Sequence, residues 1–414
     1  MKKIFTSIDI GSDTVKFLVG EEFKDRVNVL SATEITSKGV RKGLIVDSNL
    51  LVNTIKDGLK VIDNELGINI KKTIVNVPDY NAKFMFVTGS IQIKDIVNSD
   101  DVNRVVKESV YNKLDKEYEL VTVVPLCFVI DEEREVDIPI GLACKKLEVK
   151  GIMISVPKKN IYSVISVIEA AGLEVVDITL SGLSDYYQVR NKKLDSKIGA
   201  IINIGHETTN VSIINNGKMM NTETLQLGGI NIEKDIAYVF GINLIDARKI
   251  KEKFASCHKR FTSLNDTYEL TNNMGEKIKL NQLEVTEVVM SRVSEILNYA
   301  KKQINLLTKK QVDYIIITGG LTEIKSFKNL VYEILGKDVI IYLMEDIGIR
   351  DNKYTTCMGM IKYFIDKMHV RGKEYSMLSS NDEELLLTPA DTRKKEKVVV
   401  TKMFKSFIKN KEEK

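Results

Sequence analysis

The sequence predicts an α/β protein with more than one domain. Strand-like apolar runs alternate with segments of helical periodicity along most of the chain, which is typical of α/β folds. At 414 residues, the chain is too long for one ordinary hydrophobic core. In addition, a strand–turn–strand pattern occurs twice, about 190 residues apart, in equivalent strand contexts.

The individual elements are predicted in chain order from these patterns. Apolar runs bounded by polar residues predict strands at residues 4–10, 15–20, 73–77, 198–204, 211–214 and 312–318. Helical periodicity predicts helices at residues 50–66, 100–114, 159–171, 246–254 and 284–307. Gly67 is a candidate C-cap of the first helix, and Ser99 to Asp101 are suited to the N-cap region of the second. Asn215-Asn216-Gly217 predicts a tight turn.

The composition argues against several classes of protein. A net charge of +4, from 61 Lys and Arg against 57 Asp and Glu, does not indicate a nucleic-acid partner. The four cysteines lie far apart without metal-site spacing, so we expect buried thiols in a reducing cytosol. The N-terminal residues 1–13 read as a first strand and not as a signal peptide. We expect no membrane span, because no run of about 18 apolar residues occurs.

Two turns carry the strongest functional signal. They share an apolar strand, a glycine and hydroxyl side chains, and their candidate phosphate-binding residues are Gly11, Ser12, Asp13 and Lys16 in the first and Gly205, His206, Thr208 and Thr209 in the second. Such turns expose successive backbone N–H groups that bind phosphate oxygens, and a lysine adds positive charge. One copy alone would more often be an ordinary β-hairpin. The pairing favours two turns that clamp a nucleotide from both sides.

A third loop completes the set. The strand at residues 312–318 opens on Gly319, Gly320 and Leu321, and two glycines let a flat purine or ribose rest on the backbone. In this order the three loops resemble the phosphate 1, phosphate 2 and adenosine motifs of the actin/Hsp70/sugar-kinase superfamily. Lys251, in the predicted helix 246–254, is a weaker candidate for the adenine side.

Within that superfamily the chain resembles the FtsA family. The stretches that carry the resemblance are residues 37–47 (SKGVRKGLIVD), 124–154, 227–242 (LGGINIEKDIAYVFGI) and 347–363 (IGIRDNKYTTCMGMIKY). It implies a two-lobed actin-like ATPase fold with subdomains 1A, 1C, 2A and 2B, a flexible linker and a C-terminal amphipathic helix.

The resemblance also divides the chain. Subdomain 1A would span residues 1–83, 163–196 and 354–371, 1C (SHS2-like) 84–162, 2A 197–228 and 309–353, 2B 229–308, the linker 372–397 and the terminal helix 398–414. From its own pattern, the 1C segment reads as a small α+β module with strands at 84–87, 120–130 and 147–154. An ordinary structural insertion is the alternative.

The second phosphate turn departs from the family pattern. Where the family usually reads DIGGGTTD, this chain reads NIGHETTN, so Asn203 and Asn210 replace aspartates. Asparagine keeps hydrogen bonds but loses the charge that favours Mg²⁺. Asp9 is then the best remaining carboxylate for a magnesium site, and Asn203 is the second candidate residue of that site. We therefore expect Mg²⁺ to bind more weakly and Asn203→Asp to bind Mg²⁺-ATP more tightly.

Other positions also differ from the pattern. The water-positioning Gln or Glu of filament-forming relatives would fall near residues 180–185, where Ser181 and Gly182 are not good water-orienting groups. His206 is either a phosphate ligand or a turn residue, and Glu207 is expected to point outward, away from phosphates. These changes predict ATP binding with little or no hydrolysis.

The C-terminal tail has an amphipathic pattern. Its apolar face is predicted to contain Val400, Met403, Phe404, Phe407 and Ile408, and its basic face Lys402, Lys405 and Lys409. An eleven-residue helix is only about 16 Å long, too short to cross a bilayer. It suits an anionic lipid surface, with the phenylalanines among acyl chains and the lysines near headgroups. Docking on its own protein is the alternative.

The resemblance implies a function. The protein would bind ATP and Mg²⁺, self-associate into filaments on the cytoplasmic face of the cell membrane at the division site, and tether the C-terminal peptide of tubulin-like FtsZ there through about residues 229–308. Later divisome membrane proteins would be recruited through 1C. The alternatives are a PilM-like pilus-assembly adaptor without a membrane helix of its own, and a metabolic kinase or phosphatase, which Asn203 argues against.

Overall fold

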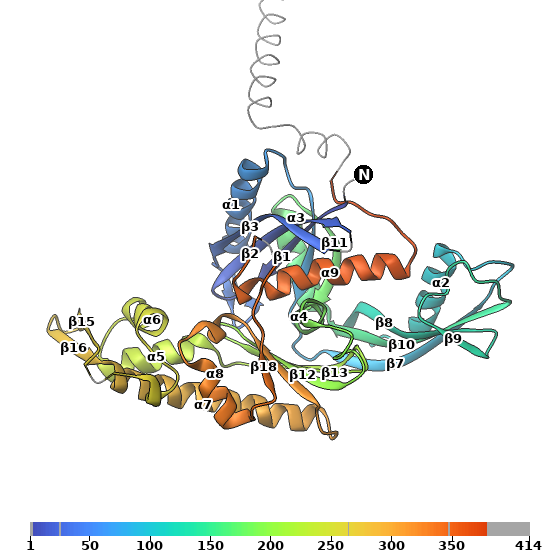
Figure 1. The fold of residues 1–414 in the computed structure, drawn as a ribbon. Helices are drawn as coiled ribbons and strands as arrows, with labels where there is room; N and C mark the ends of the chain where they lie inside the picture. The colour runs from blue at the N-terminus through green and yellow to red at the C-terminus, as the bar shows by residue number, and fades with distance from the viewer. Residues whose placement is uncertain (1–2, 25, 264, 347, 379–414) are drawn as a thin grey trace, which may run out of the picture.

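The computed structural model describes residues 3–378 except residues 25, 264 and 347. Within these residues, three sheets and the helices packed on them form two lobes and a module at one side (Figure 1). No helix in the described part is both long and apolar enough to cross a membrane. The predicted membrane helix, residues 398–414, lies outside the described residues.

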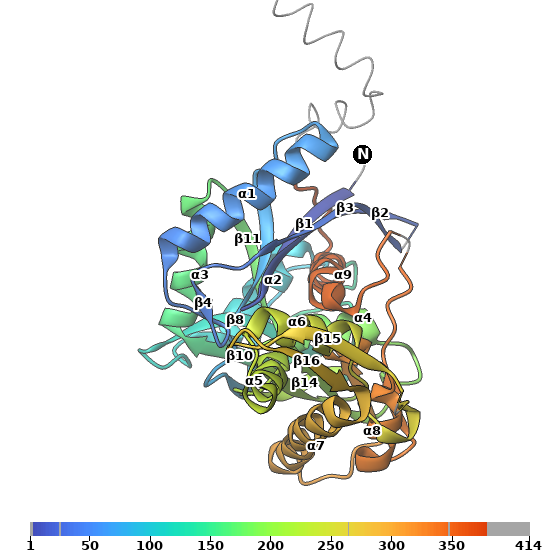
Figure 2. The same cartoon turned by 90° about the vertical axis from the view of Figure 1, so that its left-hand side faces the viewer.

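The first lobe is built on a sheet with strand order β11-β6-β1-β2-β3. Its strands are β1 (Lys3–Ile10), β2 (Thr14–Phe23), β3 (Arg26–Thr36), β6 (Lys72–Val77) and β11 (Glu174–Leu180), with a small ribbon of β4 (Val40–Arg41) and β5 (Leu44–Ile45) beside it. β1 pairs antiparallel with β2 and parallel with β6. Two helices cover one face, α1 (Ser48–Leu66) and α3 (Lys158–Ala170), and α9 (Thr355–Val370) covers the other (Figure 2).

The second lobe repeats this arrangement. Its sheet has the order β14-β13-β12-β17-β18, and β12 pairs antiparallel with β13 and parallel with β17. The strands are β12 (Ile198–Ile204), β13 (Thr209–Asn215), β14 (Lys218–Leu225), β17 (Tyr314–Thr318) and β18 (Val339–Ile341). The two predicted hairpins therefore lie at equivalent places in the two sheets.

Helices bury both faces of the second sheet. Its outer helices are α5 (Gly229–Phe240), α6 (Leu244–Lys253), α7 (Gln282–Leu307) and α8 (Phe327–Leu335), with a hairpin of β15 (Thr267–Thr271) and β16 (Lys277–Asn281) beside them. On the inner face, α4 (Ser181–Val189) packs against β12, β13 and β14 and also against α9. Thus α4 and α9 lie between the two sheets (Figure 1).

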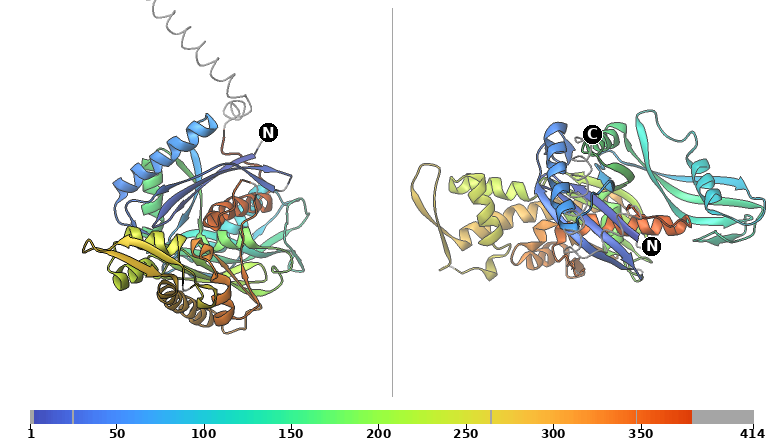
Figure 3. Two further views of the ribbon diagram at one scale, coloured as in Figure 1. Left: turned by 60° about the vertical axis from the view of Figure 1, so that its left-hand side comes forward. Right: turned by 90° about the horizontal axis from the view of Figure 1, so that it is seen from above.

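The third sheet forms the side module, which projects from the first lobe (Figure 3). Its order is β7-β10-β8-β9, with β7 (Lys83–Gln92), β8 (Tyr118–Ile130), β9 (Arg134–Val136), β10 (Lys146–Pro157) and the covering helix α2 (Ser99–Val110). The helix ends four residues before the expected position 114, because Tyr111 already leaves the helical region with φ −56° and ψ 127°. Its N-cap is Asn98, whose side chain accepts hydrogen bonds from Asp100 N and Asp101 N.

The start of the predicted linker is packed on the first lobe. Met377 and Leu378 are buried, and Met377 N donates to the Ile4 carbonyl at 2.9 Å. These two apolar side chains extend the core beside β1, so the chain stays docked at least to residue 378. The rest of the predicted linker lies outside the described residues.

Candidate functional site

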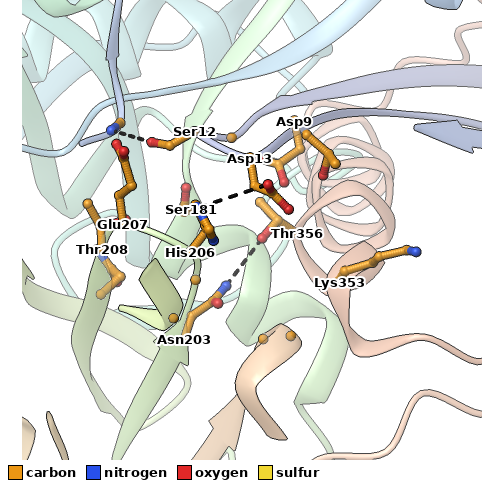
Figure 4. A pocket seen from close by; sticks show the side chains of 18 of the residues that line it. Asp9, Ser12, Asp13, Ser181, Asn203, His206, Glu207, Thr208, Lys353 and Thr356 are labelled. Carbon is orange, nitrogen blue, oxygen red and sulfur yellow. Dashed lines mark hydrogen bonds and ion pairs between the residues drawn. The ribbon is translucent and has the colours of Figure 1, made fainter. Parts of the chain in front are cut away.

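A cavity of about 540 Å³ lies between the two lobes, within the size range of small-molecule sites. It collects nearly all residues predicted for a nucleotide and its cation, namely Asp9, Gly11, Ser12, Asp13, Lys16, Asn203, Gly205, His206, Thr208, Lys251, Gly319, Gly320 and Leu321. Figure 4 labels Asp9, Ser12, Asp13, Asn203, His206 and Thr208 among them. Thr209 is the exception. Its side chain is buried, and its hydroxyl donates to the Leu227 carbonyl at 2.8 Å, so this residue supports the turn from behind.

The two hairpin turns have the same backbone geometry. Gly11 N donates to Thr14 O at 3.2 Å, and Gly205 N donates to Thr208 O at 2.9 Å. A Cβ on Gly11 would lie 2.8 Å from the Thr14 carbonyl oxygen, so this turn requires glycine. Each turn connects the central strand of its sheet to the antiparallel neighbour. Both therefore present their loops to the cavity from opposite lobes.

A cation of the opposite lobe holds the acidic residue of the first turn. Arg248 of α6 donates two hydrogen bonds to the carboxylate of Asp13, at 2.6 and 2.7 Å. Burial alone would raise the pKa of Asp13, but the Arg248 hydrogen bonds hold it below its ordinary value. Asp13 therefore faces the cavity as part of a neutralised ion pair.

Glu207 of the second turn is held in the same manner. It does not point outward, as the sequence suggested, but reaches the first lobe, where it accepts hydrogen bonds from the Arg41 guanidinium at 3.2 Å and from the backbone N–H of Lys42. The repulsion expected between Glu207 and a phosphate is thus reduced by two donors from β4 and the turn that follows it. This pairing between lobes could not be read from either segment alone.

His206 and Lys251 are engaged with a buried carboxylate. Lys251 forms an ion pair with Glu233 of α5, and His206 Nδ1 lies 3.7 Å from the same carboxylate. Burial lowers the pKa of His206, which favours the neutral imidazole. In this arrangement His206 lines the cavity with its Nε2 4.0 Å from Asp13 Oδ1, and the Lys251 ammonium is already paired.

Asp9 and Lys16 form an ion pair on the first-lobe wall. Their side chains are mostly buried, and Lys16 Nζ lies 3.0 Å from Asp9 Oδ2. Burial alone would lower the pKa of Lys16, but the Asp9 charge raises it above its ordinary value. The other Asp9 oxygen accepts a hydrogen bond from Asn76 Nδ2 at 3.0 Å, and the same amide group reaches Ser181 Oγ at 2.9 Å.

Two buried aspartates were not predicted from the sequence: Asp185 lies behind this wall, and Asp79 lines the cavity. Asp185 of α4 accepts hydrogen bonds from Asn203 Nδ2 and Thr356 Oγ1, each at 2.7 Å, and burial raises its pKa to about 7. Asp79, after β6, accepts hydrogen bonds from Asn210 of β13 and from Thr222 and Thr224 of β14. Burial raises its pKa as well. The only sequence feature that could have marked Asp79 as a site residue is its position just after the predicted strand 73–77, because ligands of α/β sheets bind at the carboxyl ends of the strands.

The two glycines after β17 differ in their surroundings. Gly319 has φ 96° and ψ 166°, and a Cβ there would lie 2.5 Å from both Asn203 Oδ1 and the Ile204 carbonyl oxygen. Gly320 has no such neighbour within 4 Å and faces open space. Leu321, at the family's third glycine, is buried in the second-lobe core. Gly319 thus allows this loop to pack closely against β12, whereas the backbone at Gly320 is accessible from the cavity.

Comparisons with known proteins bear on both the fold and the family. The family model described as cell division protein FtsA matches residues 200–359, and the model of the SHS2 domain inserted in FtsA matches residues 82–155. A cell division protein FtsA of Bacillus subtilis is 26% identical over 377 residues, covering 90% of this chain and 86% of that protein. One of Staphylococcus epidermidis is 26% identical over 404 residues, covering 94% and 86%.

Solved structures share the fold at low sequence identity. The PilM–PilN type IV pilus biogenesis complex matches with a TM-score of 0.60 and 12% identity, over 86% of this chain and 97% of that one. MreB5 of Spiroplasma citri bound to ADP matches with a TM-score of 0.54 and 13% identity, over 90% and 99%. These likenesses confirm the predicted two-lobed actin-like α/β fold.

Proposed function

Since the chain belongs to the FtsA family of cell division proteins, we propose that it is an actin-like adaptor that binds ATP in the cavity between its lobes. The observation that carries this proposal is the pair of equivalent glycine turns that face one cavity from opposite lobes. Concave rows of backbone N–H groups in such turns bind phosphate oxygens. A fold neighbour, MreB5 of Spiroplasma citri, is described with bound ADP, which supports a nucleotide of the same kind here.

The cavity suggests where the parts of the nucleotide bind. The phosphates would lie between the turns that carry Ser12 and Thr208, whose hydroxyls add donors to the backbone N–H groups. The ribose and adenine would rest on the backbone at Gly319 and Gly320. Asp13 and Glu207 border the same space, so the cations that neutralise them are part of the binding site. Phosphate affinity would then depend on lobe closure, because those cations come from the opposite lobe in each case.

The residues on the cation side fit Mg²⁺ carried by ATP. The described residues include no group of three or more His, Cys, Asp or Glu side chains placed to hold a metal. Asp9, Asn203 and Thr356 instead supply scattered oxygen atoms, which suits an ion that keeps several waters and is bound partly by phosphates. When bound, Mg²⁺ would neutralise phosphate charge.

Hydrolysis is proposed to be near background. Asn203 carries no charge, and Ser181, near the position where relatives orient water, accepts a hydrogen bond from Asn76. Calorimetric titration of the purified chain with ATP, followed by phosphate-release assays, tests this directly. We expect saturable binding with phosphate release close to the protein-free rate. Turnover at a rate comparable to that of actin filaments would contradict the proposal.

The adaptor role is proposed from the family and from one exposed surface. The end of α5 and the start of α6 expose Tyr238 (90%), Val239 (55%), Leu244 (45%) and Ile245 (71%). An apolar surface of this kind is suited to docking a peptide. We assign it to the C-terminal peptide of FtsZ, within the predicted contact region 229–308. Filament formation and recruitment of later divisome proteins through residues 84–162 complete the proposal.

Membrane attachment is proposed to come from the C-terminal tail. Each lysine near an anionic surface contributes about 1 kcal/mol. Partial immersion of the phenylalanines is offset by the cost of ordering a short helix. One tail would therefore bind weakly, and a filament would bind firmly through many tails. The protein would then act at the cytoplasmic face of the cell membrane at the division site.

Vesicle flotation with FtsZ tests the adaptor role. Anionic vesicles coated with the full chain should carry FtsZ to the lipid layer only when FtsZ retains its C-terminal peptide. Ile245→Ser should reduce this recruitment, whereas Phe86→Ser, a control of similar exposure (69%) on β7, should not. Equal recruitment of FtsZ without its peptide would contradict the assignment and favour a pilus-type adaptor.

A further inference from the structure

A buried carboxylate lies directly behind the cation side of the cavity. Asp185 is fully buried in α4 and does not line the cavity itself. Its two oxygens accept one hydrogen bond each from two residues that do line it, Asn203 of β12 and Thr356 of α9. Three elements from different parts of the chain thus meet at one carboxylate, where α4 and α9 pack between the sheets.

These hydrogen bonds fix what the cavity wall presents. The Asn203 amide uses Nδ2 as donor to Asp185, so its Oδ1 lies on the side of Gly319, where a Cβ would approach it to 2.5 Å. The Thr356 hydroxyl gives its hydrogen to Asp185 and accepts a hydrogen bond from Asn203 Nδ2 at 3.5 Å, which leaves one lone pair for another partner. Without a carboxylate behind them, the amide would be free to turn its NH₂ toward the cavity and the hydroxyl to rotate.

We propose that Asp185 is a positioning residue for the divalent cation that accompanies the nucleotide. It orients Asn203 and Thr356 so that both offer oxygen acceptors to the cation and its water shell. This role takes the place of the direct charge that an aspartate at position 203 would supply. Hard cations such as Mg²⁺ select oxygen ligands, and a group behind the ligand sets the ligand's orientation and basicity. The inference rests on the proposed binding of ATP in this cavity.

The same geometry revises the expectation for position 203. Asn203→Asp would place a second carboxylate within hydrogen-bond distance of Asp185 in a buried site, where two negative charges repel and one must take up a proton. The single change should therefore destabilise the protein instead of tightening Mg²⁺-ATP. The exchange of both residues, Asn203→Asp with Asp185→Asn, keeps one carboxylate and one amide in contact.

The test compares ATP affinity with excess Mg²⁺ and with EDTA, measured by calorimetry on the full chain. The readout is the factor by which Mg²⁺ tightens ATP binding. Asp185→Asn should lower this factor by about 10- to 100-fold, as is typical for groups behind a metal ligand, and leave affinity in EDTA close to wild type. The control is Asp79→Asn, another buried aspartate at the cavity, which should change both affinities by the same factor.

Two further variants keep the inference testable if Asp185→Asn folds poorly. Thr356→Val removes one of the two oriented acceptors and should also lower the Mg²⁺ factor. The double exchange should have a higher midpoint of thermal unfolding than Asn203→Asp alone. It should also recover the factor by which Mg²⁺ tightens ATP binding.

Equal losses with Mg²⁺ and with EDTA in Asp185→Asn, or a double exchange no better than Asn203→Asp alone, would overturn the positioning role. If wild type bound ATP equally well in both conditions, the inference would fail while the ATP proposal stood. No ATP binding in either condition would remove both.

Discussion

The two adjacent glycines after β17 give a sharp prediction, because only one of them is required by the backbone. At Gly319, φ 96° and ψ 166° fall in a region that is essentially restricted to glycine. The Cβ of an alanine there would lie 2.5 Å from the Ile204 carbonyl oxygen and 2.8 Å from the Ile204 nitrogen. These neighbours are backbone atoms of β12, which no change of rotamer can move away.

The magnitude follows from these two effects. A residue held in such a backbone region costs about 1–3 kcal/mol, and overpacking a tight site costs about 1–3 kcal/mol more. Gly319→Ala should therefore destabilise the protein by about 2–6 kcal/mol. Gly320→Ala places its methyl group in open space, so it should change the free energy of unfolding by no more than about 0.5 kcal/mol.

Denaturant unfolding and ATP titration of the matched pair provide the assay. Gly319→Ala should unfold at a lower denaturant concentration and also bind ATP more weakly, since relief of the clash displaces β12 and the second phosphate turn. Gly320→Ala should unfold like wild type. If the two variants had equal midpoints, the account of this loop would be refuted.

Three other perturbations test separate parts of the structure. Arg248→Gln should weaken ATP binding by about tenfold, because it leaves the Asp13 carboxylate unneutralised beside the phosphates. Adding Asp13→Asn to this variant should restore the ATP affinity measured by calorimetry. If the affinity did not recover, the role of the Arg248–Asp13 ion pair would be contradicted. The folded-state pKa of Asp185, about 7, is raised above its unfolded value, so its contribution to stability is complete below about pH 4 and is lost as pH rises to about 7. In EDTA, the free energy of unfolding of wild type should accordingly fall over this range relative to Asp185→Asn, by at most about 1.4 kcal/mol per pH unit, and parallel profiles would argue against a raised pKa. Phe404→Glu with Phe407→Glu should release the chain from anionic vesicles in flotation at moderate salt without changing ATP affinity, and continued flotation would show that the tail is not the anchor.

Local patterns predicted the parts of the fold that local interactions determine. The hairpin turns at Gly11 and Gly205 and the helix end at Gly67 could be read directly, because each depends on a few neighbouring residues. The hairpin of β15 and β16 was not predicted, since five-residue strands in a polar segment give little periodic signal. The end of α2 was misplaced because the helical periodicity of the sequence continues past Tyr111, where the backbone has already left the helical conformation.

The site was predicted as a set of loops but not as a network. Sequence reasoning treated Glu207 as isolated, whereas its partners lie in the segment of Arg41 and Lys42. It also missed Asp185, whose partners are Asn203 and Thr356, because nothing in a helical pattern marks one buried polar residue as different from another. Such contacts depend on how the two sheets enclose α4 and α9. The family resemblance predicted the arrangement of the two lobes, whereas the pairings between these side chains became known only from the three-dimensional structure.

A crystal structure of the chain with ATP and Mg²⁺ is the most direct test of the central claim. We predict electron density for one nucleotide in the cavity between the lobes, with its phosphates between the turns of Ser12 and Thr208 and its adenosine against Gly319 and Gly320. The cation should lie on the side of Asp9 and Asn203. Clear density for ATP elsewhere on the protein, or an empty cavity at saturating ATP, would contradict the claim that this cavity is a nucleotide site.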